Sequence, residues 1–343
     1  MLSERASTVL NILVDQYVRT AAPVASDDIA RLSATKVSPA TVRSAMSQLT
    51  DEGYISRPHV SAGAIPSDLG YRYCMDTMTE LPSLPAALRR QIDHQFGQMD
   101  PHAEVWSQQC ASILSRLTAS LAIVTVPQAS SPRLRRLQLV YLQEFLVLLI
   151  IVLQETRLLR RLLPMAEGVD QEKLDQAASK LNDYLNGLTS DEVETSPLEL
   201  TPLEERLKRE SVDLMREAEG GGTQDHYVDG LRRLLNQPEF SQGSRAKELV
   251  EMVEERVLLE SVLSEVPAPD DIAVFIGGEN QHEALRPYGV ILCGYGIPGQ
   301  IGGTICVIGP TRMGYAQAIS GVRYLSSAMN QLVQDFHATL PAG

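Results

Sequence analysis

The stretch between Ser38 and Gly53 carries small, polar and apolar side chains in a helical pattern. At about 100° per residue, the apolar residues fall on one side of a helix; they are Val42, Ala45, Met46 and Leu49. The candidate contact residues on the remaining surface are Thr41, Arg43, Ser44, Ser47 and Gln48. Small side chains let a helix enter the DNA major groove closely, while arginine, glutamine and serine offer hydrogen bonds to base edges and phosphates. The pattern indicates a helix that reads double-stranded DNA.

The ends of this helix carry strong local signals. Ser38 is a good N-cap, because its hydroxyl accepts a hydrogen bond from an unpaired backbone N–H. Pro39 follows at the first helical position, where its missing N–H costs nothing, and Gly53 suits a left-handed C-cap. An ordinary amphipathic surface helix remains the alternative, because helical periodicity is common.

The neighbouring segments favour the DNA-reading interpretation. A first helix is predicted from Ser3, with a break at Ala21-Ala22-Pro23, and a short second helix is predicted with Ser26 as its cap. After Gly53, two short extended runs flank a turn at Ser61-Ala62-Gly63. Three helices followed by a ribbon predict a winged helix-turn-helix over residues 1–80.

The ribbon adds candidate contacts to those of the helix. They are Arg57, His59, Ser61 and Gly63. Arg57 and His59 are placed to approach phosphate or the minor groove, although a purely structural His59 is an equal alternative. With the helix residues, they form the predicted DNA-binding surface.

The remaining chain alternates helical and extended segments, which predicts an α+β fold. A linker is predicted at 79–85, a helical region at 86–121, and three strands at 137–142, 146–153 and 157–163. The second strand is nearly all aliphatic, which predicts cover on both faces. Residues 168–236 are interpreted as a mainly helical insertion. The segments expected after it are a helix at 245–264, strands at 272–276, 290–293 and 303–308, and a helix at about 311–337.

Bulk composition restricts the class of protein. The longest apolar run, Phe145 to Leu153, is too short to span a bilayer, so no membrane association is predicted. The start of the chain shows no export leader. The four cysteines form no C-x-x-C pair, as expected for free thiols in a reducing cytoplasm. A cytoplasmic protein is therefore predicted.

The charge is not that of a generic nucleic-acid binder. The formal net charge is −13, and residues 1–80 hold seven Lys/Arg against nine Asp/Glu. Without a strong basic surface, we expect few phosphate contacts per protomer and a modest dependence of DNA affinity on salt. Recognition would depend on geometry and dimerisation.

Enzymatic and metal-dependent functions find little support. The six histidines lack metal-ligand spacing. Gly294 to Gly299 is a literal G-x-G-x-x-G. A dinucleotide site requires this loop to open a helix and an Asp or Glu about 20 residues later. Here the loop leads into a β-rich run, and no Asp or Glu occurs from residue 300 to 334. A turn between two strands is the better interpretation. Glu279, Asn280 and His282 follow a strand, where Asn280 is expected to cap a helix rather than serve catalysis. We predict no metal, no cofactor and no enzymatic activity.

Several long motifs resemble one family. They are VSPATVR, GY, PH-x-SAG-x-IP and GYRY near the start, then LLNQPEF, IGGEN and GTICVIGPTRMGY downstream in the same order. This combination resembles the HrcA family of heat-inducible transcription repressors over nearly the whole chain. The resemblance implies a GAF-like domain in two parts, 86–167 and 237–343, interrupted by an inserted dimerising domain at 168–236.

Four positions depart from the family pattern. Ser44-Ala45 stands where the family usually has Asn-Asp, Ala64 replaces an arginine, and Gly314 replaces an aspartate. The changes at residues 44, 45 and 64 are expected to remove groups that touch DNA.

The resemblance also implies a function. By this resemblance, the protein is expected to be a homodimeric repressor of heat-shock chaperone operons. It would bind an inverted-repeat operator of the CIRCE type and be kept active by the GroEL chaperonin. The alternative is a ligand-sensing transcription regulator with a metabolite in the GAF-like domain.

Overall fold

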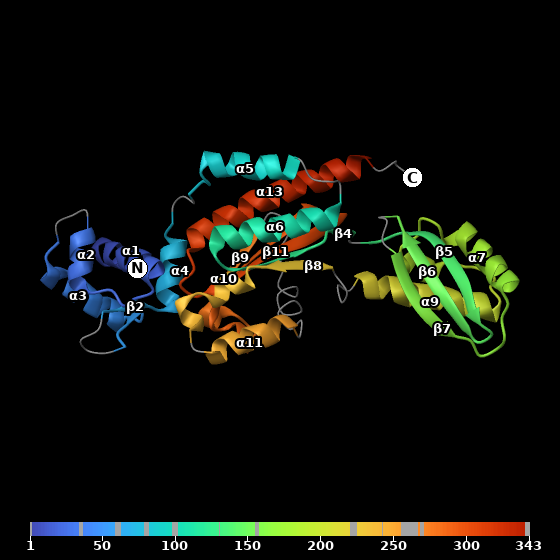
Figure 1. Ribbon diagram of the computed structural model, residues 1–343, viewed down its shortest axis with the longest axis horizontal. Helices are drawn as coiled ribbons and strands as arrows, with labels where there is room; N and C mark the ends of the chain where they lie inside the picture. The colour runs from blue at the N-terminus through green and yellow to red at the C-terminus, as the bar shows by residue number, and fades with distance from the viewer. Residues whose placement is uncertain are drawn as a thin grey trace. The chain divides into compact units, whose positions relative to one another are not determined.

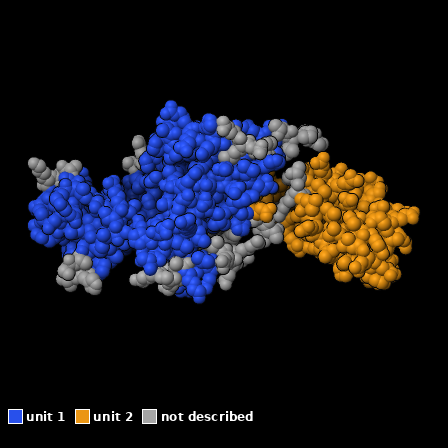
Figure 2. Space-filling view, viewed as in Figure 1, with its two compact units in different colours: residues 1–125, 226–295, 304–343 blue, residues 126–225, 296–303 orange. Residues whose placement is uncertain are grey.

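The computed structural model describes residues 2–33, 37–58, 63–78, 82–97, 102–129, 131–154, 158–219, 225–241, 243–254, 267 and 271–339. The chain divides into two compact units (Figure 2). Unit 1 comprises Met1–Thr125, His226–Tyr295 and Thr304–Gly343, and unit 2 comprises Val126–Asp225 and Gly296–Gly303. Helices and antiparallel sheets occur in both units (Figure 1), which confirms the predicted α+β class.

The described residues of 2–78, termed the head, form the start of unit 1. Their elements are α1 (Glu4–Thr20), α2 (Ser26–Leu32), α3 (Pro39–Asp51), β1 (Ile55–Ser56), β2 (Ile65–Pro66) and α4 (Asp68–Asp76). The two strands pair antiparallel, with Ile55 opposite Pro66. One apolar core joins α1, α2, α3, the ribbon and α4. The head is therefore a three-helix core followed by a two-stranded ribbon and a fourth helix.

Capping residues define two of these helices as the sequence predicts. Ser3 Oγ accepts a hydrogen bond from the Ala6 N–H, and Ser38 Oγ accepts one from the Thr41 N–H. Gly53 has a φ of +79° just beyond α3, which confirms the left-handed position expected there. The prediction for α2 was wrong, because Ala25 is the N-cap and no side chain caps this helix.

The remaining described residues of unit 1, termed the body, surround an antiparallel sheet. The strand order is β8 (His226–Asp229), β3 (Leu121–Thr125), β11 (Ile301–Pro310), β10 (Tyr288–Ile297) and β9 (Ile272–Ile276). The helices are α5 (Ala86–Gly97), α6 (Ala103–Thr118), α10 (Leu231–Leu235), α11 (Gly243–Glu254) and α13 (Tyr315–Thr339). Helices α6 and α13 lie on one side of the sheet and α10 and α11 on the other (Figure 1). Every residue of β3 is accordingly buried.

Strands β3 and β8 of this sheet were missed by the sequence interpretation. The predicted helical region at 86–121 ends earlier, because α6 stops at Thr118 and Ala119 adopts φ +51° before β3 begins. The second missed strand, β8, pairs with β3 although it falls within the segment predicted to be helical. Its four residues, His226–Asp229, are too few and too polar for an alternating pattern to stand out.

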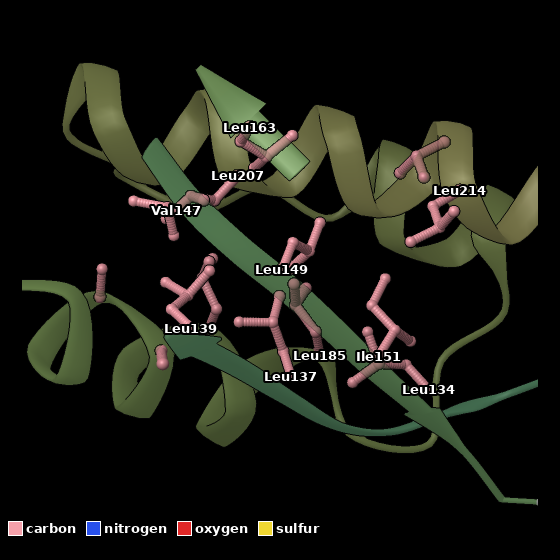
Figure 3. Packing of buried hydrophobic residues seen from close by; sticks show 14 of the residues in the cluster. Leu134, Leu137, Leu139, Val147, Leu149, Ile151, Leu163, Leu185, Leu207 and Leu214 are labelled. Atoms are coloured by element: carbon pink, nitrogen blue, oxygen red, sulfur yellow. The ribbon is translucent and has the colours of Figure 1, made fainter. Parts of the chain in front are cut away.

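Unit 2 contains a second sheet with helices on one face. The strands β5 (Leu134–Gln143), β6 (Leu146–Leu153) and β7 (Leu158–Pro164) pair antiparallel in sequence order. Helices α7 (Gln171–Leu185), α8 (Ser190–Thr195) and α9 (Pro202–Glu219) follow, and β4 (Gln128–Ala129) pairs with the start of β11. Leucines from the inner face of the sheet interdigitate with leucines of α7 and α9, as Figure 3 shows.

The outer face of this sheet differs from the prediction. Burial alternates along β6, so that Val147, Leu149, Ile151 and Leu153 are buried while the residues between them are only half-buried. The expectation that β6 is covered on both faces was therefore wrong for the part of the chain that the structure describes. The near-continuous aliphatic run arises because the outward-facing residues of β6 are apolar without being fully buried within one chain.

The compact units divide at residues 126 and 226 rather than at the expected 168 and 236. Strands β5 to β7 pack against α7 and α9 and share their core, so they lie in unit 2 and not with the sheet of the body. Strand β8 pairs with β3 in unit 1. Pairing across about 100 residues of sequence leaves no local signal at either boundary.

Candidate nucleic-acid interface

The exposed face of α3 carries most of the residues expected to contact DNA. Val42, Ala45, Met46 and Leu49 are buried in the head core, while Arg43, Ser44, Ser47 and Gln48 are exposed. Thr41 is half-buried. The predicted division of the helix into an apolar and a polar side is thus present, and four of the five candidates share one solvent-facing surface.

Two candidates on α3 already make side-chain hydrogen bonds. Thr41 Oγ1 lies 2.9 Å from Ser38 Oγ, and Gln48 Nε2 donates to Glu52 Oε1 at 2.8 Å. Thr41 therefore belongs to the helix cap, whereas Gln48 must exchange a surface bond with Glu52 before it can bind a base. Ser44 and Ser47 present short hydroxyls that let the backbone of α3 approach another molecule closely.

Arginines supply the positive charge of this surface. Arg43 lies on α3, and Arg57 directly follows β1; both are exposed. Within the described part of the chain, neither arginine forms a salt bridge, in contrast to Arg31, which pairs with Asp28. Both guanidinium groups are therefore available to phosphates or to the acceptor atoms of guanine.

The ribbon candidates have different outcomes. His59 and Ser61 lie outside the described residues. Gly63 is half-buried, and a Cβ at this position would lie 2.5 Å from the backbone of Val24, so glycine is required for packing here. A DNA contact by Gly63 stays a prediction.

Two of the departures from the family pattern have a structural explanation that the sequence did not reveal. Ala64 is fully buried and pairs with Val24 in an isolated bridge, and Ala45 is also buried. Both side chains point into the head core, so a larger side chain at either position must displace its neighbours. The expected loss of DNA-contacting groups at these two positions stays a prediction. Ser44 is the one of the three that lies on the exposed face.

The glycine-rich motif and its neighbours have structural roles. Residues 294–299 span the end of β10 and the turn into β11, as the sequence favoured. Asn280 does not cap a helix as expected: its buried Nδ2 donates to the carbonyls of Gly277, Leu285 and Tyr288. Glu279 forms a salt bridge with Arg72 of α4.

Sequence reasoning missed the residues that join the head to the body. Asp68 and Arg72 on α4 contact the turn after β9, and Arg312 contacts the end of α1. These residues fall inside the motifs GYRY, IGGEN and GPTRM or directly beside them. The motifs identified a family but gave no sign of these contacts, since 207 residues separate Arg72 from Glu279 and 294 separate Val18 from Arg312.

The described residues contain no group of three or more His, Cys, Asp or Glu side chains placed to hold a metal ion. Likewise, none of the described helices is both long and apolar enough to cross a membrane. Two buried polar groups of the body bond to the main chain: Tyr295 Oη donates to the Thr125 carbonyl, and Ser326 Oγ donates to the Gly294 carbonyl at 3.2 Å.

Comparisons with known proteins agree with a regulatory function. The family model of the HrcA protein C-terminal domain matches residues 104–319. The heat-inducible transcription repressor HrcA of Dehalococcoides mccartyi is 36% identical over 99% of both chains. That of Herpetosiphon aurantiacus is 34% identical over 98% of this chain and 96% of its own. A crystal structure described as a hypothetical protein has the same fold, with a TM-score of 0.58 and 22% identity over 98% of each chain.

These relatives define the class of the protein as a repressor of transcription that responds to heat shock. The family model matches more than half of the chain, and the relatives align with nearly all of it. The chain belongs to the HrcA family of heat-inducible transcription repressors.

Proposed function

We propose that the protein is a homodimeric repressor of heat-shock chaperone operons that binds an inverted-repeat operator. In each protomer, the head acts as a winged helix-turn-helix: α3 enters the major groove, and the ribbon contacts the adjoining backbone or minor groove. The observation that carries the proposal is the exposed face of α3, where Arg43, Ser44 and Ser47 lie together opposite a fully buried apolar face. Two-fold symmetry of a dimer then requires an inverted repeat.

The outer face of the sheet in unit 2 supports the dimer. Leu158 and Leu162 on β7 are 58% and 57% exposed. Leu162 is directly opposite Leu148 of β6, and Leu148 is opposite Val140 of β5, so aliphatic side chains cross the whole sheet. Arg136 and Arg160 lie on the same face, opposite Val152 and Ile150 of β6. Exposed apolar side chains with charged residues beside them are typical of a protein–protein contact. We propose that two copies of this face pack together.

The operator and the chaperone partner are proposed from membership of the family. The operator is of the CIRCE type, and the GroEL chaperonin maintains the active repressor. When heat diverts chaperonin to unfolded proteins, repression is lost and the chaperone genes are transcribed.

A binding experiment tests this proposal. The full-length protein is titrated into a labelled duplex that carries the inverted repeat and into a scrambled duplex of equal composition, at one fixed salt concentration. We expect selective binding to the inverted repeat, and a larger DNA-competent fraction after incubation with chaperonin and ATP. Equal affinity for both duplexes would contradict the proposed operator, and an unchanged competent fraction would contradict the chaperonin dependence.

A further inference from the structure

Helix α4 of the head is joined to one turn of the body by charges of both signs. Arg72 Nε donates to Glu279 Oε1 at 2.9 Å, and Arg72 Nη2 donates to the Val274 carbonyl at 2.7 Å and contacts Glu279 Oε2. In the reverse direction, the Gly278 N–H donates to Asp68 Oδ2 at 2.9 Å. A two-pronged arginine–carboxylate contact fixes angle as well as distance, so α4 is held in one orientation.

The turn of the body is shaped for this contact. Gly277 has a φ of +57°, and a Cβ at this position would overlap the Asp68 carboxylate. Glycine alone tolerates both the backbone conformation and the close approach. The Ile276 N–H donates to Glu279 Oε2 at 2.8 Å, which orients the carboxylate toward Arg72.

A second attachment holds a different helix of the head. Arg312 follows β11 and donates from Nη1 to the Val18 carbonyl at 3.1 Å. Val18 lies in the last turn of α1, where carbonyls lack helical partners and a cation is favoured by the helix dipole. Gln237 and Glu239 of the body hold the same guanidinium. Because the body contacts both α1 and α4, the head cannot rotate about either contact alone.

The orientation of α1 and α4 is transmitted to the reading helix by packing. Leu10 of α1, Val42 and Leu49 of α3, and Cys74 of α4 belong to one buried cluster. Because close-packed cores transmit displacement with little compliance, fixing α1 and α4 fixes α3.

We infer that Asp68, Arg72, Glu279 and Arg312 form a clasp that sets the direction in which α3 faces, and thereby the half-site spacing that the dimer accepts. This inference rests on the proposed function. In helix-turn-helix dimers the half-site spacing mirrors the geometry of the two reading heads. None of the four residues lies on the exposed face of α3, so they are positioning residues. Base readout belongs to α3 and spacing selection to the clasp.

The first test varies the spacing of the operator. Binding is measured to inverted repeats whose half-sites are moved apart in single-base steps through about one helical turn, roughly 10 base pairs, and to an isolated half-site. The wild-type protein should prefer one spacing sharply. In Arg72→Met, the ratio of the affinity at the preferred spacing to that at the other spacings should fall at least fivefold. The affinity of this variant for an isolated half-site should change by less than twofold. The control is Arg31→Met, an exposed arginine of α2 that pairs within its own helix.

A second test needs no DNA and separates the clasp from the proposed function. Spin labels are attached at Asp27→Cys in the head and Gln331→Cys in the body, both exposed positions, and labelled protein is diluted with unlabelled protein. We expect a narrow distance distribution that broadens with Arg72→Met and with Glu279→Gln, but not with Arg31→Met. An unchanged distribution, or an unchanged spacing preference in a variant that binds the half-site, would overturn the clasp. If the wild-type protein bound the inverted repeat no better than a scrambled duplex, the proposed function would be overturned instead.

Discussion

Arg43 is the residue on which recognition depends most directly. Its guanidinium lies on the exposed face of α3 and has no salt-bridge partner among the described residues. If it contacts a base edge, Arg43→Ala should weaken operator binding by roughly 1–3 kcal/mol and relax base preference at one position of each half-site. Titrations with operators substituted at single positions measure this, with Arg90→Ala on α5 as an exposed control. Unchanged affinity would reject the role of Arg43.

Ala64 gives the opposite expectation. Because its side chain is fully buried beside Val24, Ala64→Arg has to displace neighbouring side chains of the head core in this chain. Overpacking alone costs about 1–3 kcal/mol, so the midpoint of chemical unfolding should fall. Ser44→Asn is the matched control, since residue 44 is exposed and the change should leave stability unaltered. Wild-type stability together with tighter DNA binding in Ala64→Arg would contradict the buried position.

At the scale of elements, the sequence predicted the features that depend on neighbouring residues, such as the ends of a helix and its buried face. Ser38, Pro39 and Gly53 define α3, and the apolar spacing of Val42 and Leu49 assigns its buried face correctly. Non-local pairing could not be predicted in the same way. Strand β8 has four residues and takes its place only by pairing with β3. Likewise, Ala64 is buried because it meets Val24, about 40 residues earlier in the chain.

The contact between α4 and the body should depend on pH. Burial raises the pKa of Glu279, but the hydrogen bond and charge of Arg72 and the Ile276 N–H outweigh it, and the pKa lies below its ordinary value of 4.5. A carboxylate with a lowered pKa in the folded state contributes stability above its unfolded pKa and loses it as the pH falls through the folded one.

Acid titration of wild type and Glu279→Gln measures this contribution. Between about pH 5 and pH 3, the free energy of unfolding of the wild-type protein should fall more steeply than that of Glu279→Gln, because the variant lacks the titrating group. The two proteins should keep parallel profiles above pH 5. Identical slopes across the acid range would show that the Arg72–Glu279 pair does not stabilise the fold.

At the scale of the whole molecule, repression requires two heads on one operator. The outer face of the sheet in unit 2 is the surface proposed to join them. Leu158→Glu combined with Leu162→Glu should shift the protein to monomers in light scattering, because charges on this face oppose burial. Tyr184→Glu, at an exposed aromatic of α7 that is 59% exposed, is the control and should stay dimeric. A dimeric Leu158/Leu162 variant would place the dimer contact elsewhere.

The most direct test locates α3 on DNA. All four cysteines are buried, so Ser47→Cys introduces one exposed thiol on the reading face, to which an iron chelate that cleaves DNA can be attached. We expect cleavage in the major groove of both half-sites, symmetric about the centre of the inverted repeat, and no specific cleavage from the chelate at Tyr184→Cys. Specific binding with cleavage absent from the half-sites, or spread evenly along the duplex, would contradict the claim that α3 reads the operator.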